Sequence, residues 1–152
     1  MQKQYLSQES FEAIKKELDG LKTTKRAEIA QRLKIAKEYG DLSENSEYSE
    51  AREEQANVEG RIFELEELVK NVEIVAKQTG GDTVHVGTTI VVKKGDKTAT
   101  YTIVGSYEAK PEEGKISDES PLGKAFLKRK VGDEVKITTP AGTMTYEILK
   151  IE

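Results

Sequence analysis

Two carboxylates, Asp41 and Glu44, are the side chains of this sequence best suited to chemistry. They belong to a short polar run, residues 40–48, which separates two long helical patterns and is called the tip segment below. Hard cations such as Mg²⁺ prefer carboxylate oxygens and usually keep several of their waters. Two exposed carboxylates would bind Mg²⁺ weakly alone, so the pair predicts half of a metal site that another macromolecule completes.

The spacing of the two acids also fits a structural role. Asp41 could be the N-cap of the following helix, with Glu44 as the N3 partner of a capping box. The positive end of the helix dipole would favour both charges. Because the spacing fits both interpretations, metal binding and capping both stay open here.

Three basic residues, Lys34, Lys37 and Arg52, flank the tip segment. They could form a patch that faces the phosphates of a nucleic-acid end, since cations beside phosphates supply most of the affinity in such contacts. They could equally be surface charges that pair with Glu50 or Glu53.

Two helical patterns must position these side chains. The first begins at Ser7 or Ser10 and ends at Gly40, a residue suited to the left-handed conformation just after a helix. Successive four-residue steps around Lys25 predict a stutter, which would locally relax a supercoil.

The second pattern begins near Ser43 or Glu44 and keeps a heptad spacing up to residue 76. Its seam consists of Tyr48, Ala51, Gln55, Val58, Ile62, Leu65, Val69, Val72 and Ala76. Charges of opposite sign in the two patterns would attract each other. Because a short connection forces an antiparallel arrangement, residues 1–79 are predicted to form a long coiled-coil hairpin with an acidic tip.

Residues 80–152 change to short β-type runs. Two predicted β-hairpins, over residues 88–104 and 135–151, flank one short helix for which Ser120 is a suitable N-cap and Pro121 a suitable first residue. The predicted fold class is therefore α+β, with a helical hairpin followed by a small antiparallel β domain.

Composition excludes several classes of site. The 152 residues contain no cysteine and a single histidine, His85, which excludes disulfides, thiolate metal sites and histidine-based zinc sites. No Gly-rich phosphate loop or hydrolase motif occurs, which argues against an autonomous active site. No apolar run approaches the ~20 residues of a membrane span and the N-terminus lacks a signal-peptide core, so a soluble, cytoplasmic protein is expected.

Two long motifs resemble the bacterial Gre transcript-cleavage factors, and the GreA type in particular. The first is the tip segment, Gly40-Asp41-Leu42-Ser43-Glu44-Asn45-Ser46-Glu47-Tyr48, followed by matching stretches at 51–53 and 59–62. The second lies downstream at residues 116–125, 131–135 and 139–142. The motifs occur in the right order and spacing, so the resemblance covers essentially the whole chain.

This resemblance implies a coiled-coil hairpin followed by an FKBP-like β domain of residues 80–152. In the family, the β domain docks on the rim of the secondary channel of RNA polymerase and the hairpin reaches the catalytic centre. The resemblance gives Asp41 and Glu44 the role of ligands to a Mg²⁺ shared with the polymerase. It assigns the remaining site residues as Lys37 and Arg52 for RNA contact, and Ser120, Pro121, Leu122 and Gly123 for docking.

The implied function is that of a transcription elongation factor that stimulates the polymerase's own Mg²⁺-dependent cleavage of backtracked RNA 3′ ends and rescues arrested complexes. Such a protein is not an enzyme by itself. Its partners would be RNA polymerase and the nascent RNA 3′ end, and it would act as a monomer without a membrane. The sparse basic patch suits the GreA type more than the more basic GreB type.

Three alternatives remain at this stage. A paralogous polymerase-binding regulator or inhibitor would lack cleavage activity, although Leu42 and Ser43 separate the acids here while related inhibitors have a more densely acidic tip. An inert coiled-coil adaptor would use the tip only as a cap. A prolyl isomerase would need an aromatic-lined pocket, for which the β domain offers Tyr101, Tyr107, Phe126 and Tyr146.

Overall fold

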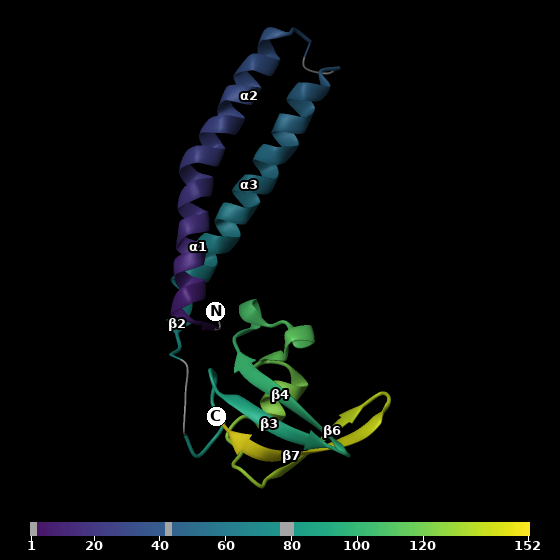
Figure 1. Ribbon diagram of the computed structural model, residues 1–152. Coiled ribbons are helices and arrows are strands. Elements are labelled where there is room, and N and C mark those ends of the chain that lie inside the picture. Colours follow the sequence, from purple (N-terminus) through teal and green to yellow (C-terminus); the bar gives the residue numbers. More distant parts are fainter. Residues whose placement is uncertain (1–2, 42–43, 77–80) are drawn as a thin grey trace. The chain divides into compact units, whose positions relative to one another are not determined.

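The computed structural model describes residues 3–41, 44–76 and 81–152 (Figure 1). Contacts divide the chain into two compact units, of which one is Phe11–Asn71 and the other combines Met1–Ser10 with Val72–Glu152. The expected domain boundary between residues 79 and 80 lies outside the described residues. The architecture is mixed α+β, with a helical hairpin near the N-terminus and a β-sheet in the C-terminal part.

The helical unit is an antiparallel hairpin. Its first arm runs from α1 (Gln8–Gly20) through the π-helical turn η1 (Leu21–Lys25) into α2 (Arg26–Glu38), and its second arm is α3 (Ser46–Lys70). Figure 1 shows α2 and α3 side by side. The π-helical turn lies where the sequence predicts a stutter, because a wider turn accommodates apolar residues spaced by four.

Apolar residues of the predicted seam hold the two arms together. Ile29, Val58 and Ile62 form a buried cluster with partly buried Leu18, Leu21 and Leu33 around it. Ala51 and Leu65, also on the predicted seam, are completely buried. The three- and four-residue spacing therefore identified the buried face of α3 correctly between Ala51 and Leu65.

The predicted end of the second helix is wrong. Instead of continuing to Ala76, α3 ends at Lys70, and Asn71 follows as its C-cap. Strand β2 (Val72–Ile74) then pairs in parallel with the N-terminal strand β1 (Gln4–Leu6). The β-branched residues of β2 favour an extended backbone, and the backbone partner for it comes from far away in the sequence.

The main sheet has five strands in the order β5-β4-β3-β7-β6. Strands β3 (Thr89–Lys94) and β4 (Lys97–Val104) form the first predicted hairpin, and β6 (Glu134–Thr139) and β7 (Gly142–Ile151) form the second. Gly95 takes φ +61° in the two-residue loop of the first hairpin, a conformation that glycine adopts at no steric cost. Both hairpins are confirmed.

The expectation of a purely antiparallel sheet is wrong at one edge. Strand β5 (Lys115–Ser117) pairs in parallel with β4. The connection from β4 contains two short 3-10 helices, η2 (Ser106–Glu108) and η3 (Pro111–Glu113). These turns return the chain to the same end of the sheet, which a parallel pairing requires.

The predicted short helix is α4 (Pro121–Phe126), and it supplies the centre of the sheet's core. Phe126 is fully buried, with its ring centroid 6.1 Å from that of Tyr101 and 5.6 Å from that of Tyr146. Desolvation raises the pKa of the Tyr101 hydroxyl above its ordinary value. Three of the four aromatic residues considered for a prolyl-isomerase pocket thus pack on one another in the core.

Candidate functional site

The first arm of the hairpin ends just before the tip carboxylates. The N–H of Tyr39 donates to the carbonyl of Ala36 (3.2 Å), and Gly40 follows with φ +108°. This confirms Gly40 as the glycine that terminates the helix in a conformation other residues rarely adopt. Asp41 comes directly after this turn and is exposed.

The second arm begins with a cap that was not predicted. Asn45 is the N-cap of α3, and its side-chain oxygen accepts a hydrogen bond from the N–H of Tyr48 (3.1 Å). The interpretation of Asp41 as N-cap and Glu44 as N3 is therefore wrong, because Asn is an equally good cap and lies one residue before the helix. Asp41 and Glu44 both lie outside the helices and both are exposed. Leu42 and Ser43 lie outside the described residues.

Asn45 also joins the two arms. Its side-chain amide nitrogen donates to the carbonyl oxygen of Ala36, at 2.7 Å. Ala36 is 3% exposed and Ala51 is fully buried, so small residues let the helices approach each other near the tip segment. One side chain thus fixes both ends of the stretch that carries Asp41 and Glu44.

Asp41 and Glu44 are the two carboxylates that the connection between α2 and α3 offers to a cation. Within residues 3–41, 44–76 and 81–152, no group of three or more His, Cys, Asp or Glu side chains could hold a metal ion. A hard cation at Asp41 and Glu44 fits the oxygen chemistry of the pair but requires further ligands, from water or from a partner.

Some basic residues of the hairpin pair with carboxylates of the opposite helix, and others do not. Farther from the tip segment, cations pair with carboxylates of α3: Nε and Nη2 of Arg26 donate to the two Glu59 carboxylate oxygens, each at 2.8 Å, and Lys25 binds Glu54 at 2.7 Å. Arg32 binds Glu54 as well. The hydrogen bonds from Lys25 and then Arg32 lower the pKa of the Glu54 carboxyl below its ordinary value. The predicted attraction between the two arms is real for these residues.

Lys34, Lys37 and Arg52, in contrast, have no carboxylate within ion-pair distance among the described residues. All three are exposed, and Arg52 donates to the side-chain oxygen of Gln55 (2.9 Å). Among the described residues, neither Glu50 nor Glu53 forms an ion pair with any of the three. These three are the cations nearest the tip segment, and Lys15 and Lys16 of α1 likewise have no ion pair in the part of the chain that the structure describes.

The residues predicted as a docking loop are the N-cap and first turn of helix α4. Ser120 is the N-cap and accepts a hydrogen bond from the N–H of Gly123 (3.0 Å), while Pro121 is the first helical residue, as predicted. Gly123 is buried, and a Cβ there would lie 1.9 Å from the carbonyl oxygen of Ser117. A side chain at this position would push α4 away from β5.

A groove of about 340 Å³ lies beside this loop. Its lining is mostly apolar and includes Pro121, Leu122, Ile137, Met144 and Tyr146. Of the four aromatic residues named for an isomerase pocket, only Tyr146 lines this groove. Pro121 is exposed and Leu122 is half-buried, so both present apolar surface to a partner.

Comparison with known sequences gives two adjoining matches. Residues 4–74 match the family model described as "Transcription elongation factor, N-terminal", and residues 77–152 match "Transcription elongation factor, GreA/GreB, C-term". The chain belongs to the GreA/GreB family. The resemblance of the tip segment and of the downstream motif to the Gre factors is thereby confirmed.

Relatives within the family match along nearly their full length. Transcription elongation factor GreA of Bacillus velezensis is 47% identical over 148 residues, covering 96% of this chain and 94% of that protein. GreA of Thermoanaerobacter pseudethanolicus is 48% identical over 149 residues, covering 96% of this chain and 95% of that protein. The crystal structure of Thermus aquaticus Gfh1 is 26% identical with a TM-score of 0.46, covering 100% of this chain and 99% of that one.

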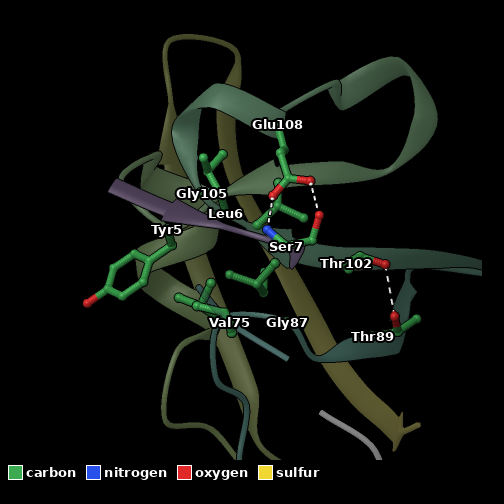
Figure 2. Close-up of a pocket in the computed structure, with 12 residues that line it drawn as sticks. Tyr5, Leu6, Ser7, Val75, Gly87, Thr89, Thr102, Gly105 and Glu108 are labelled. Carbon is green, nitrogen blue, oxygen red and sulfur yellow. Dashed lines mark hydrogen bonds between the residues drawn. The ribbon is translucent and has the colours of Figure 1, made fainter. Parts of the chain in front are cut away.

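A second pocket, of about 250 Å³, is formed where β1 lies against the loop after β4 (Figure 2). The Glu108 carboxylate accepts the N–H and the hydroxyl of Ser7, both at 2.9 Å, and also the hydroxyl of Ser10. The Ser7 hydroxyl accepts the N–H of Ser10 (3.2 Å), which supports Ser7 over Ser10 as the cap of α1. No pattern in the sequence pointed to Glu108, since its partners lie about a hundred residues away.

Two further observations concern His85 and the membrane. His85 is exposed and its Nε2 lies 2.7 Å from the Thr83 hydroxyl. No helix in the described parts of the chain is both long and apolar enough to cross a membrane.

Proposed function

We propose that this protein is a transcription elongation factor that acts with RNA polymerase and stimulates cleavage of backtracked RNA 3′ ends. The observation that supports this proposal most directly is the pair Asp41 and Glu44, which are exposed and lie outside both helices. The chain that carries them matches GreA proteins along nearly its full length. In a backtracked complex the RNA 3′ end is displaced from the catalytic centre, and cleavage creates a new 3′ end in register.

The two parts of the chain have separate tasks in this proposal. The helical hairpin acts as a coiled coil that enters the secondary channel, and the β domain, FKBP-like and spanning about residues 80–152, docks on the channel rim. The apolar seam and the pairs across α2 and α3 support a hairpin stable enough to act alone in the channel. The protein acts as a monomer in the bacterial cytoplasm.

Asp41 and Glu44 would hold a Mg²⁺ together with ligands of the polymerase active site. When bound, the ion activates a water molecule and stabilises the leaving oxygen of the cleaved phosphodiester. The contribution of this chain is to carry two carboxylates, already positioned by the ends of α2 and α3, to a centre that lacks them. This is why the protein is not an enzyme by itself.

Lys37 and Arg52 would orient the displaced RNA through its phosphates, with Lys34 adding to the local positive charge. Their lack of acidic partners among the described residues supports this role, because a cation already paired with a carboxylate has less attraction for phosphate. Lys25, Arg26 and Arg32 would instead stabilise the hairpin, because their charges are already paired with Glu54 or Glu59.

Docking would use the start of α4, at Ser120, Pro121, Leu122 and Gly123. Pro121 and Leu122 offer the apolar contact, while Ser120 and Gly123 fix the loop from behind. The adjoining groove offers room for an apolar side chain of the polymerase.

The test is to add the purified protein to a stalled, backtracked elongation complex and to follow the length of the RNA. Shortening that depends on the protein and on Mg²⁺ supports the proposal. Binding to the polymerase without shortening would instead identify a regulator or inhibitor of the same family. Absence of binding would reject both.

A further inference from the structure

The side chain of Asn45 makes two hydrogen bonds in opposite directions. Its oxygen accepts the N–H of Tyr48 at 3.1 Å, inside the first turn of α3. Its nitrogen donates to the carbonyl of Ala36 at 2.7 Å, inside the last turn of α2. An amide can do both because it carries an acceptor and a donor on one planar group.

This arrangement joins the chain before the two carboxylates to the chain after them. Asp41 and Glu44 both lie between Ala36 and Asn45 in the chain, so the bridge restrains the stretch that carries them from both sides. The Ala36 carbonyl also accepts the N–H of Tyr39, so the start of the stretch and its end share one anchor. Without the amide donor, α3 would keep its cap but the two helix ends would lose this link.

We propose that Asn45 is a positioning residue for transcript cleavage, which sets the separation and orientation of Asp41 and Glu44 so that both can reach one cation. This inference rests on the proposed function. Ligands held close to their productive geometry need no reordering when the ion binds, and displacement by about 1 Å can cost about a hundredfold in rate.

Two substitutions separate the bridge from the cap. Asn45→Asp keeps the size and the capping oxygen but places a second oxygen against the Ala36 carbonyl. Asn45→Ser also keeps a capping oxygen but is too short to span the same distance. We expect both variants to melt close to wild type and bind polymerase with unchanged affinity, while the maximal cleavage rate falls at least about tenfold. Agreement between the two variants would show that the charge introduced by Asn45→Asp is not the cause.

Asn71 provides a matched control at the other end of α3. Its side-chain nitrogen donates to the carbonyl of Glu67 at 2.9 Å, so it makes an amide-to-backbone bond of the same kind. Asn71→Ser should leave the cleavage rate within about twofold of wild type. Equal losses at Asn45 and Asn71 would overturn the inference, because general loosening of the hairpin would then explain both.

Two readouts test the mechanism beyond cleavage rate. The NMR order parameters of the Asp41 and Glu44 amides should fall in both Asn45 variants of the free protein but not in Asn71→Ser. Adding Asn45→Ser to the double variant Asp41→Asn with Glu44→Gln should cause little further loss, because the residue acts through these carboxylates. The positioning role would be rejected if Asn45→Ser lowered the cleavage rate of the double variant by the same factor as it lowers that of wild type. Unchanged order parameters would reject it as well.

The outcomes also separate this inference from the proposed function. A wild-type protein that binds polymerase but does not shorten the RNA overturns the proposed function, and the inference with it. A wild-type protein that cleaves, beside Asn45 variants that cleave equally well, overturns the inference alone.

Discussion

The charges of Asp41 and Glu44 are not needed to begin α3, because Asn45 supplies the cap. A charge at an exposed loop position contributes little to stability. The two carboxylates can therefore be neutralised without removing the cap of the helix, which makes their chemistry testable in isolation.

Asp41→Asn and Glu44→Gln should each abolish most of the cleavage stimulation while the melting temperature and polymerase affinity stay near wild type. A neutral amide keeps the shape but loses the charge that draws Mg²⁺ from its waters. Raised Mg²⁺ should restore part of the activity. RNA cleavage at a series of Mg²⁺ concentrations measures this, and normal cleavage by both variants would refute the ligand role.

Arg52→Glu should reduce both cleavage and crosslinking of the RNA to the hairpin, most strongly at low salt, because it reverses a charge near phosphates. The stability of this variant should hardly change, because the side chain that Arg52 contacts in the structure is the neutral Gln55. Arg26→Glu is the matched control: it breaks the bidentate pair with Glu59 and should lower stability while leaving RNA crosslinking intact. The reverse pattern would show that Arg52 is structural.

Asp118 should make the stability of the fold decrease as pH rises. An acid stabilised by an ion pair has the opposite effect. Burial, and then the nearby Glu119 charge, raise the pKa of the Asp118 carboxyl above its ordinary value. The folded chain therefore binds this proton more tightly than the unfolded chain does, so stability falls as pH rises from about 3.9 through the raised value.

Asp118→Asn should consequently increase stability at neutral pH, and the gain should vanish in acid, where the wild-type carboxyl is protonated. Denaturant unfolding of both proteins across a pH series measures this difference. A constant difference between the two proteins at every pH would contradict the assignment.

At the level of elements, a residue that fits two patterns leaves the choice between helix and strand to a distant partner. The period of the seam predicted the hairpin and the alternation of β-branched residues predicted both β-hairpins, because each depends on neighbours in sequence. Val72 fits the heptad and the strand β2 equally well. What decides between them is the pairing with β1, a partner some seventy residues away that periodicity cannot reveal.

The same limit applies to the site. The sequence identified Asp41 and Glu44 as chemical groups, and the structure leaves them exposed as a ligand role requires. It could not choose the cap, because Asp41 and Asn45 have nearly equal capping ability and only the position of the first helical turn separates them. The bridge from Asn45 to Ala36 was also hidden, since it depends on how closely the two arms approach.

The buried face of α3 leads to a prediction about stability, for which the next residue in the chain serves as the control. Ile62 is 2% exposed, whereas its neighbour Phe63 is 69% exposed. Ile62→Ala should cost about 2–5 kcal/mol in the free energy of unfolding because it leaves a cavity in the core of the hairpin. Phe63→Ala removes a larger side chain but should cost only about 0.5 kcal/mol. Denaturant unfolding measures both, and similar costs would mean that the seam is assigned wrongly.

In the whole molecule, the proposal separates binding from cleavage, because the docking loop and the tip segment belong to different units. Replacing both Pro121 and Leu122 with Ala should weaken polymerase binding by at least about tenfold, or about 1.4 kcal/mol, if they form the apolar anchor. Leu149→Ala is the control, since Leu149 is a partly exposed leucine of the same unit that does not line the groove. Thermal unfolding should show that both variants remain cooperatively folded.

Cleavage rates measured against the concentration of the factor then distinguish the two tasks. With the docking variant, the concentration for half-maximal cleavage should rise, but the maximal rate should return to that of wild type, because mass action compensates for weak binding and the carboxylates are intact. With Asp41→Asn, half-saturation should be unchanged and the maximal rate should stay low at every concentration, since more factor brings no more ligands. A docking variant whose maximal rate stays low would mean that the loop also positions the hairpin in the channel, and the division of tasks between the units would have to be abandoned.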